Sequence, residues 1–328
     1  MAGIGIFNSP GRSLEKGIER AARADELGFD SVYTTHIAGR DSLTLLAAFA
    51  EKTEKVKLGT GVLPIFSRTP CSTAQTAATI DELSHGRMVI GLGVSHKVTV
   101  ENWFDSEIVK PVTQMREYAS IVRAVMLGEQ PPEGEFFNSS FQFMGYEARK
   151  ELPIYIGALS PNMLQLAGEI GDGVMLWLCG PEYIERVVIP EVAKGREKAG
   201  KTMDGFDVVA AVPVGLTDDP GAARDAMRGQ LLTYASLPFY RKMLEASGWT
   251  DDIAAFDAGM GEGDAEKAKA GLSDEMIDSL IGAGDADAVR DAVKRYQDAG
   301  TVSPCIGGLP GGEFDAAMEA VAEMLQPA

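Results

Sequence analysis

A short apolar run followed by a stretch with helical periodicity recurs along nearly the whole chain of 328 residues. This alternation is typical of α/β proteins, in which helices cover a parallel sheet. Helical stretches include residues 14–27, which end at Gly28, 42–53 and 71–83. The eight apolar runs predicted as strands span residues 3–7, 31–35, 56–63, 87–93, 153–158, 173–178, 208–216 and 303–307.

Eight successive β/α units predict one closed (β/α)8 TIM barrel with a helical jacket, and no linker divides residues 1–328 into domains. A doubly wound open sheet has the same local pattern and is the alternative. A standard barrel needs about 250 residues. The excess is therefore expected in loop insertions, at about residues 95–152 and 236–271.

The two insertions have different patterns. The first contains a predicted helix at 113–127 and a segment rich in Phe, Asn and Ser at 136–143 that resembles a small hairpin. The second is polar, and its Gly-rich and acidic tract at 257–264 suggests either a mobile lid or a solvated surface loop. The surface loop is the favoured interpretation, because charged runs are usually solvated.

Charge and cysteine content exclude several classes of function. Thirty Lys and Arg against 48 Asp and Glu leave a net charge of −18, which disfavours nucleic acid and anionic membranes as partners. No signal peptide or apolar run long enough for a membrane span is visible. Cys71, Cys179 and Cys305 lie far apart without CxxC spacing, so neither a disulfide framework nor a metal site is expected. A cytoplasmic location fits this pattern.

Two of the three histidines follow strands and are candidate catalytic residues. In a parallel barrel the reactive groups lie where strands end, and both His36 and His96 come just after predicted strands. An imidazole titrates near pH 6.5 and can give or take a proton under working conditions. His85 precedes a strand and is followed by Gly86, so a tight turn on the opposite face is the favoured interpretation.

Two glycine-containing segments at strand ends are candidate binding elements. Gly59 and Gly61 within one strand indicate either a bulge near a ligand or tight packing in the barrel. Ser160 and Pro161 predict a helix start just after a strand, where free backbone N–H groups can hold a phosphate or serve structure alone. No GxGxxG, Walker, HExxH or GxSxG motif is present.

The order of several segments resembles the bacterial luciferase-like superfamily. The resemblance covers roughly the first two thirds of the chain and its last strand and helix. It implies a (β/α)8 barrel that holds a flavin or deazaflavin, most similar to the branch that uses coenzyme F420. The matching segments are residues 21–32, 56–62, 81–87, 91–93, 115–118, 153–158 and 166–173.

The same resemblance implies roles for individual residues. Gly61 and Val62 match a pair that forms a non-proline cis peptide behind the central ring of the deazaflavin. His36 falls where relatives place a histidine beside the reactive carbon, although Thr35 stands where they usually have an acidic residue. His96 lies near the glutamate proton donor of sugar-phosphate-oxidising relatives, which makes such a substrate less expected. The implied cofactor-binding residues are Thr35, Gly61, Val62, Gly91, Gly93, Ser95, Gly157, Ala158, Leu159 and Ser160.

The implied reaction is hydride transfer between C5 of the deazaflavin and a carbonyl, imine or activated alkene, with His36 or His96 managing the proton. We expect a small, fairly apolar substrate. Because F420 carries an anionic tail, we also expect at least one of Arg40, Arg68 and Lys97 beside it. The rim aromatics expected to line the substrate pocket are Phe66, Trp103, Phe104, Trp177, Phe239 and Tyr240.

The sequence leaves other functions open. The main alternative is a two-component monooxygenase that uses reduced FMN and oxygen on the same barrel. A non-catalytic flavin-binding protein is another, against which the two rim histidines argue. By resemblance, a homodimer is expected.

Overall fold

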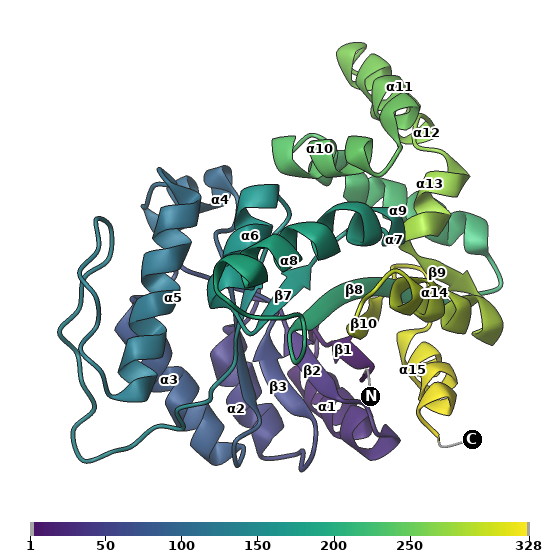
Figure 1. Ribbon diagram of the computed structural model, residues 1–328. Helices are drawn as coiled ribbons and strands as arrows, with labels where there is room; N and C mark the ends of the chain where they lie inside the picture. Colours follow the sequence, from purple (N-terminus) through teal and green to yellow (C-terminus); the bar gives the residue numbers. More distant parts are fainter. Residues whose placement is uncertain (1–2, 327–328) are drawn as a thin grey trace.

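The computed structural model describes residues 3–326, and its parallel strands close into a barrel surrounded by helices (Figure 1). The barrel order is β1, β2, β3, β5, β6, β7, β8 and β10. β10 pairs in parallel with both β8 and β1, which closes the ring. The barrel prediction is therefore confirmed and the open sheet is wrong. The strands are β1 (Gly5–Phe7), β2 (Ser31–Thr34), β3 (Lys57–Thr60), β4 (Leu63–Pro64), β5 (Met88–Gly93), β6 (Ile154–Gly157), β7 (Gly173–Leu176), β8 (Asp207–Leu216), β9 (Gly282–Gly284) and β10 (Ser303–Gly308).

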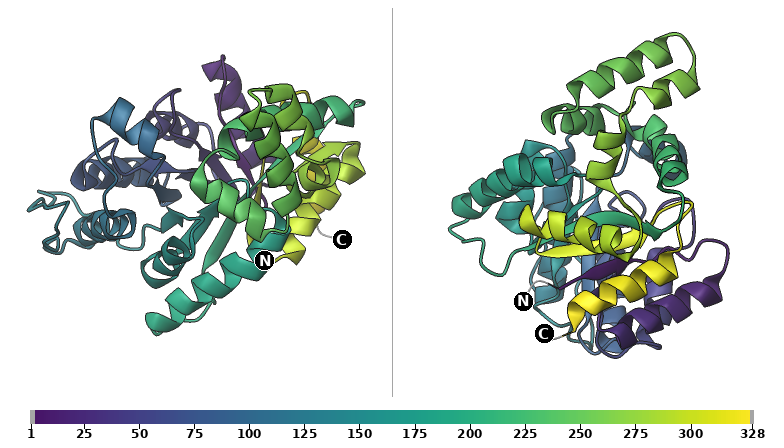
Figure 2. Two further views of the ribbon diagram at one scale, coloured as in Figure 1. Left: turned by 90° about the horizontal axis from the view of Figure 1, so that it is seen from above. Right: turned by 90° about the vertical axis from the view of Figure 1, so that its right-hand side faces the viewer.

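Helices cover the outside of the barrel, as two perpendicular views show (Figure 2). Several begin at a residue whose side chain accepts a backbone N–H, as Ser13, Asp41, Thr69 and Asp285 do. The helices are α1 (Leu14–Leu27), α2 (Ser42–Ala50), α3 (Pro70–Leu83), α4 (Lys97–Phe104), α5 (Pro111–Leu127), α6 (Pro161–Ile170), α7 (Pro181–Tyr183), α8 (Ile189–Lys198), α9 (Pro220–Tyr234), α10 (Pro238–Ala246), α11 (Thr250–Gly261), α12 (Ala265–Ala270), α13 (Asp274–Leu280), α14 (Ala286–Asp298) and α15 (Phe314–Ala322). A π-helical turn spans Ile184–Val188 and a 3₁₀ turn spans Glu323–Leu325.

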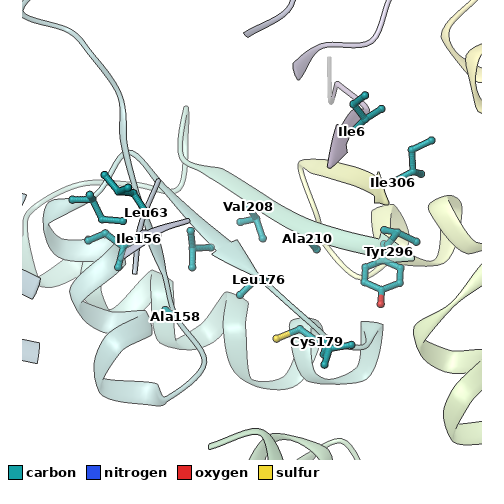
Figure 3. Packing of buried hydrophobic residues seen from close by; sticks show 14 of the residues in the cluster. Ile6, Leu63, Ile156, Ala158, Leu176, Cys179, Val208, Ala210, Tyr296 and Ile306 are labelled. Carbon is teal, nitrogen blue, oxygen red and sulfur yellow. The ribbon is translucent and has the colours of Figure 1, made fainter. Parts of the chain in front are cut away.

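Large and small residues alternate inside the barrel. The buried rings of Tyr33 and Tyr155 occupy its interior, together with smaller apolar side chains. A Cβ atom at Gly59 would lie 2.5 Å from the Tyr33 ring, and one at Gly173 would lie 2.8 Å from the Tyr155 ring. The glycines therefore make room for the tyrosines, so tight packing accounts for Gly59. Apolar residues on the outward face of the strands pack against the helices, as in Figure 3.

The predicted strand at 56–63 is interrupted. The structure divides it into β3 and β4, and the peptide bond between Gly61 and Val62 at the break is cis, as the resemblance implies. His85 has a φ of 55° and Gly86 one of 83°, which confirms the predicted turn. Short β9, which pairs with β8, was not predicted.

The hairpin predicted at 136–143 is wrong. This segment contains no strand and runs as irregular chain beside α3 and α5 (Figure 1). The Glu117 carboxylate on α5 accepts the backbone N–H groups of Glu135, Phe136 and Phe137 at 2.9, 2.8 and 3.1 Å. These amides are bonded to a side chain, so a strand ladder does not form.

The second insertion is largely helical, and the tract at 257–264 is only in part the predicted surface loop. Helix α11 continues through Gly261, and exposed residues 262–264 form the turn into α12. Helices α10, α11 and α12 occupy it, and α11 and α12 extend away from the barrel in Figures 1 and 2. Ile253 and Phe256 are buried, and Asp264 accepts the N–H groups of Glu266 and Lys267 at the start of α12. Within residues 3–326, no helix is both long and apolar enough to cross a membrane.

Candidate active site at the mouth of the barrel

The C-terminal ends of the strands bring the predicted cofactor residues to one face. Thr35 follows β2, and the Gly61–Val62 pair follows β3. Gly91 and Gly93 lie in β5, Ser95 follows it, and residues 157–160 end β6 and begin α6. Thr35, Val62, Ser95 and Gly157 are half-buried, whereas Gly91, Gly93 and Ala158 are buried. The predicted set is therefore grouped at the mouth.

The side chain of Val62 packs between two glycines of neighbouring strands. A Cβ atom at Gly93 would lie 2.4 Å from Cγ2 of Val62, and one at Gly157 would lie 3.2 Å from its Cγ1. Gly61 is equally constrained, since its Cβ would lie 2.4 Å from the Phe7 ring. The glycines thus hold Val62 in a fixed position, and its half-buried side chain forms a firm apolar wall at the mouth.

Helix α6 begins at the same face. Ser160 is its N-cap residue and Pro161 its first residue, as predicted. The Ser160 side chain makes no capping hydrogen bond, and the Leu159 carbonyl accepts a hydrogen bond from Tyr183 Oη at 2.7 Å. The helix start therefore has a free hydroxyl and amide groups that an anion can occupy.

His36 is held by the first residue of α2. The Ser42 backbone N–H donates to Nδ1 of His36 at 3.3 Å, and Ser42 Oγ lies 3.0 Å from the same nitrogen. Desolvation by burial lowers the pKa of His36 below its ordinary 6.5; the Asp41 charge opposes this and Arg68 adds to it. The ring is therefore neutral at neutral pH.

Relatives usually have an acidic residue where this chain has Thr35. Here Asp41 brings a carboxylate near His36, but it does not hydrogen-bond to the ring. Its Oδ2 lies 3.8 Å from Nδ1 of His36 and accepts a hydrogen bond from Arg68 at 2.7 Å. Its Oδ1 accepts the N–H and hydroxyl of Thr44, both at 2.8 Å. Burial alone would raise the pKa of Asp41, but Thr44 and Arg68 outweigh it and the pKa is lowered. Thr35 instead bonds Ser9, with 2.9 Å between their hydroxyl oxygens.

His96 belongs to a separate aromatic cluster. Its ring centroid lies 5.8 Å from that of Tyr240 and 6.3 Å from that of Tyr234. Tyr234 in turn lies 4.8 Å from Tyr240 and 6.4 Å from Trp177. Burial lowers the pKa of His96, so this ring is also neutral at neutral pH.

A cavity of about 450 Å³ opens beside this cluster. Trp177, one of the predicted pocket residues, and Tyr234 form part of its wall. Trp103 and Phe239 are 53% and 60% exposed and do not line it, nor does half-buried Phe66, so their contact with substrate stays a prediction. The cavity is lined by Trp177, Pro213, Gln230, Thr233, Tyr234, Gly308, Leu309 and Pro310, none of which is charged.

The three predicted cations have different environments. Arg40 donates to the backbone carbonyls of Gly11 and Arg12 and holds the loop after β1. Arg68 pairs with Asp41. Lys97 is the most available, with its Nζ 3.5 Å from Glu101 and its side chain 73% exposed.

Sequence reasoning missed Asp41, Ser42 and Tyr234. Asp41 and Ser42 carry the signal of a helix start, which gives no indication that they also hold His36. Tyr234 lies at the end of α9, remote in sequence from the other residues of the mouth.

Comparisons with known proteins agree with this architecture. Residues 2–303 match the family model described as luciferase-like monooxygenase. The chain is 34% identical to a 5,10-methylenetetrahydromethanopterin reductase of Archaeoglobus fulgidus, over 88% of this chain and 87% of the relative. The solved coenzyme F420 dependent tetrahydromethanopterin reductase from Methanopyrus kandleri is 26% identical, with a TM-score of 0.81 over 98% of this chain and 97% of that one. An F420-dependent secondary alcohol dehydrogenase shares the fold, with a TM-score of 0.79 at 21% identity over 98% and 97% of the two chains.

Proposed function

We propose that this chain, which belongs to the luciferase-like monooxygenase family, is an oxidoreductase that uses coenzyme F420 to transfer a hydride to or from a small organic substrate. The observation that carries the proposal is the similarity to the Methanopyrus kandleri reductase, which extends over 98% of the chain and includes the whole barrel. FMN is the competing cofactor.

The residues at the mouth fit a deazaflavin. A planar ring system needs a firm apolar surface, and Val62, fixed between Gly93 and Gly157, offers one. An anionic tail needs hydrogen-bond donors, and the start of α6 supplies backbone amides and the uncapped hydroxyl of Ser160. Gly61 and Val62 would then back the ring, and residues 157–160 would hold the tail.

When bound, the deazaflavin supplies or accepts a hydride at C5, and the protein's own groups position the substrate and manage its polar atom. His36 reaches the mouth from β2 with its Nδ1 already bonded, so Nε2 is the nitrogen available to a substrate. His96 packs on Tyr240 and on Tyr234, and Tyr234 lines the cavity. We assign His36 the polar contact with substrate and His96 a supporting place behind Tyr234.

The cavity supports a small, fairly apolar substrate. Its wall combines aromatic and proline rings with the uncharged amide and hydroxyl of Gln230 and Thr233. A chain of net charge −18 without a cation at this wall offers no partner to an anionic substrate. Ketones, imines and activated alkenes fit these requirements.

Isotope transfer tests the reaction. F420 reduced with deuterium at C5 is mixed anaerobically with the protein and a panel of ketones, imines and enones. We expect one deuterium on carbon in the product of at least one compound, detected by mass spectrometry. Turnover that requires reduced FMN and oxygen, with no deuterium transferred from F420, would replace this proposal with a monooxygenase.

A further inference from the structure

We propose that the start of α2 fixes His36 as a neutral imidazole with its hydrogen on Nε2, so that the ring donates a hydrogen bond to the substrate's oxygen or nitrogen and does not carry the reaction's proton. Ser42 is the positioning residue in this arrangement. The assignment of a substrate contact rests on the proposed function, whereas the state of the ring rests on the described residues alone.

The hydrogen bonds around Nδ1 determine the tautomer. A backbone N–H can only donate, and the N–H of Ser42 points at Nδ1 over 3.3 Å. Nδ1 must therefore be the unprotonated nitrogen, and Ser42 Oγ at 3.0 Å can donate to it as well. If Nδ1 carried a hydrogen, two N–H groups would face each other beside Ser42, which is fully buried.

The helix start and Arg68 also favour a neutral ring, and Asp41, whose charge opposes them, does not bond to it. Nδ1 lies at the N-terminus of α2, where the partial positive charge of the helix disfavours an imidazolium. Asp41 and Arg68 are the charged groups that act on the ring. Both oxygens of Asp41 are occupied by Thr44 and Arg68, and its Oδ2 stays 3.8 Å from Nδ1, beyond hydrogen-bond distance. Asp41 thus does not form the acid–imidazole pair that would hold a hydrogen on Nδ1.

A neutral ring of this tautomer has a restricted chemistry. Its one hydrogen is on Nε2, and releasing it would leave an imidazolate, which is a poor product at neutral pH. The ring can instead stabilise negative charge that develops on a carbonyl oxygen or imine nitrogen during reduction, and the proton that completes the product comes from water. Nε2 already carries its hydrogen, so the ring could accept a proton only at Nδ1, where that proton would displace the N–H of Ser42.

Nitrogen NMR of the cofactor-free protein tests the tautomer directly. The chain has three histidines, so selective ¹⁵N-histidine labelling gives few ring signals, and His36→Asn identifies those of His36. We expect a protonated Nε2 and an unprotonated Nδ1 at pH 7, unchanged in Ser42→Ala, which keeps the backbone N–H. Asp41→Asn, which keeps a helix-capping side chain, is expected to preserve the tautomer too. A protonated Nδ1 in the wild type, or a tautomer that changes in Asp41→Asn, overturns the proposal.

Kinetics test the role in the reaction. A neutral donor predicts that kcat for reduction stays level from about pH 7 to 9, whereas an imidazolium acid predicts a fall of about tenfold per pH unit above its pKa. His36→Phe, which removes the donor, should lower kcat by about 100-fold or more, and His36→Asn should recover part of it. If the spectrum agrees but no F420-dependent turnover is found, the proposed function fails and the tautomer assignment stands.

Discussion

Val62 and Gly93 are in such close contact that a single methyl group added to Gly93 would lie 2.4 Å from Cγ2 of Val62. The contact joins the bulge after β3 to the end of β5. It places an apolar side chain at the mouth of the barrel, against the glycines of two neighbouring strands. The shape of the proposed ring-binding wall therefore depends on two small neighbours as much as on Val62.

Gly93→Ala should destabilise the protein by about 1–3 kcal/mol, because the added methyl group displaces Val62 from its place between the strands. Urea unfolding measures this change. Val62→Ala removes the clashing carbon, so the double variant should lose much less than the sum of the two single variants. Strictly additive effects would show that Val62 and Gly93 are not in the contact described.

Trp177→Ala should raise KM for apolar substrates by about tenfold or more, because Trp177 forms a wall of the uncharged cavity. Trp177→Phe retains an apolar ring and serves as the matched control, with a smaller change. Binding of F420, which we assign to β3, β5 and β6, should be little altered in both. A variant that loses cofactor affinity while keeping KM would place Trp177 against the cofactor instead.

Lys97→Gln should weaken F420 binding roughly threefold at low salt, because this lysine is the most available of the three expected cations. This difference in affinity should disappear at about 1 M salt, because screening then limits electrostatic attraction to about 3 Å. Lys294→Gln is the matched control, since Lys294 is also exposed and pairs with an acid four residues later, on α14. Equal effects of the two substitutions would mean that only net charge matters.

Glu169 gives stability a defined pH dependence. Hydrogen bonds from Arg116, at 2.8 and 2.7 Å, and then Lys198 lower the pKa of Glu169 from 4.5 to about 2, although burial opposes this. The depressed pKa stabilises the folded state above about pH 4.5, and the stabilisation is lost as the pH falls toward about 2.

Glu169→Gln should therefore destabilise the protein at pH 7 by about 1–2 kcal/mol, a value reduced for the solvent exposure of its partners. The difference in unfolding free energy between wild type and variant should narrow as the pH is lowered below 4.5, as measured by urea unfolding. A gap that is independent of pH would show that the loss comes from packing and not from charge.

The sequence predicts the barrel because its eight strands lie in short, mostly apolar runs and several of the helices between them have a clear start. Sequence reasoning fails where a side chain replaces backbone pairing. Glu117 takes three amides that a hairpin would use, and its own position in α5 gives no sign of this. The acidic tract at 257–264 is likewise a loop only in part, because α11 continues through Gly261 with Phe256 and Gly259 buried.

The candidate site shows the same division. The residue types at the strand ends and the resemblance to a family place the expected cofactor residues at one face, and Thr35 marks a departure that the sequence makes visible. The sequence does not show which group holds His36 in the absence of that acidic residue. Ser42 lies six residues beyond His36, and only the turn into α2 brings its N–H onto the imidazole.

Equilibrium titration of the purified protein with F420 and with FMN, each oxidised and reduced, tests the central claim most directly. Fluorescence or absorbance of the cofactor reports binding in each case. We predict saturable binding of F420 that is at least about tenfold tighter than that of FMN, a difference of about 1.4 kcal/mol. Tighter binding of reduced FMN, or binding of neither cofactor, would contradict the assignment.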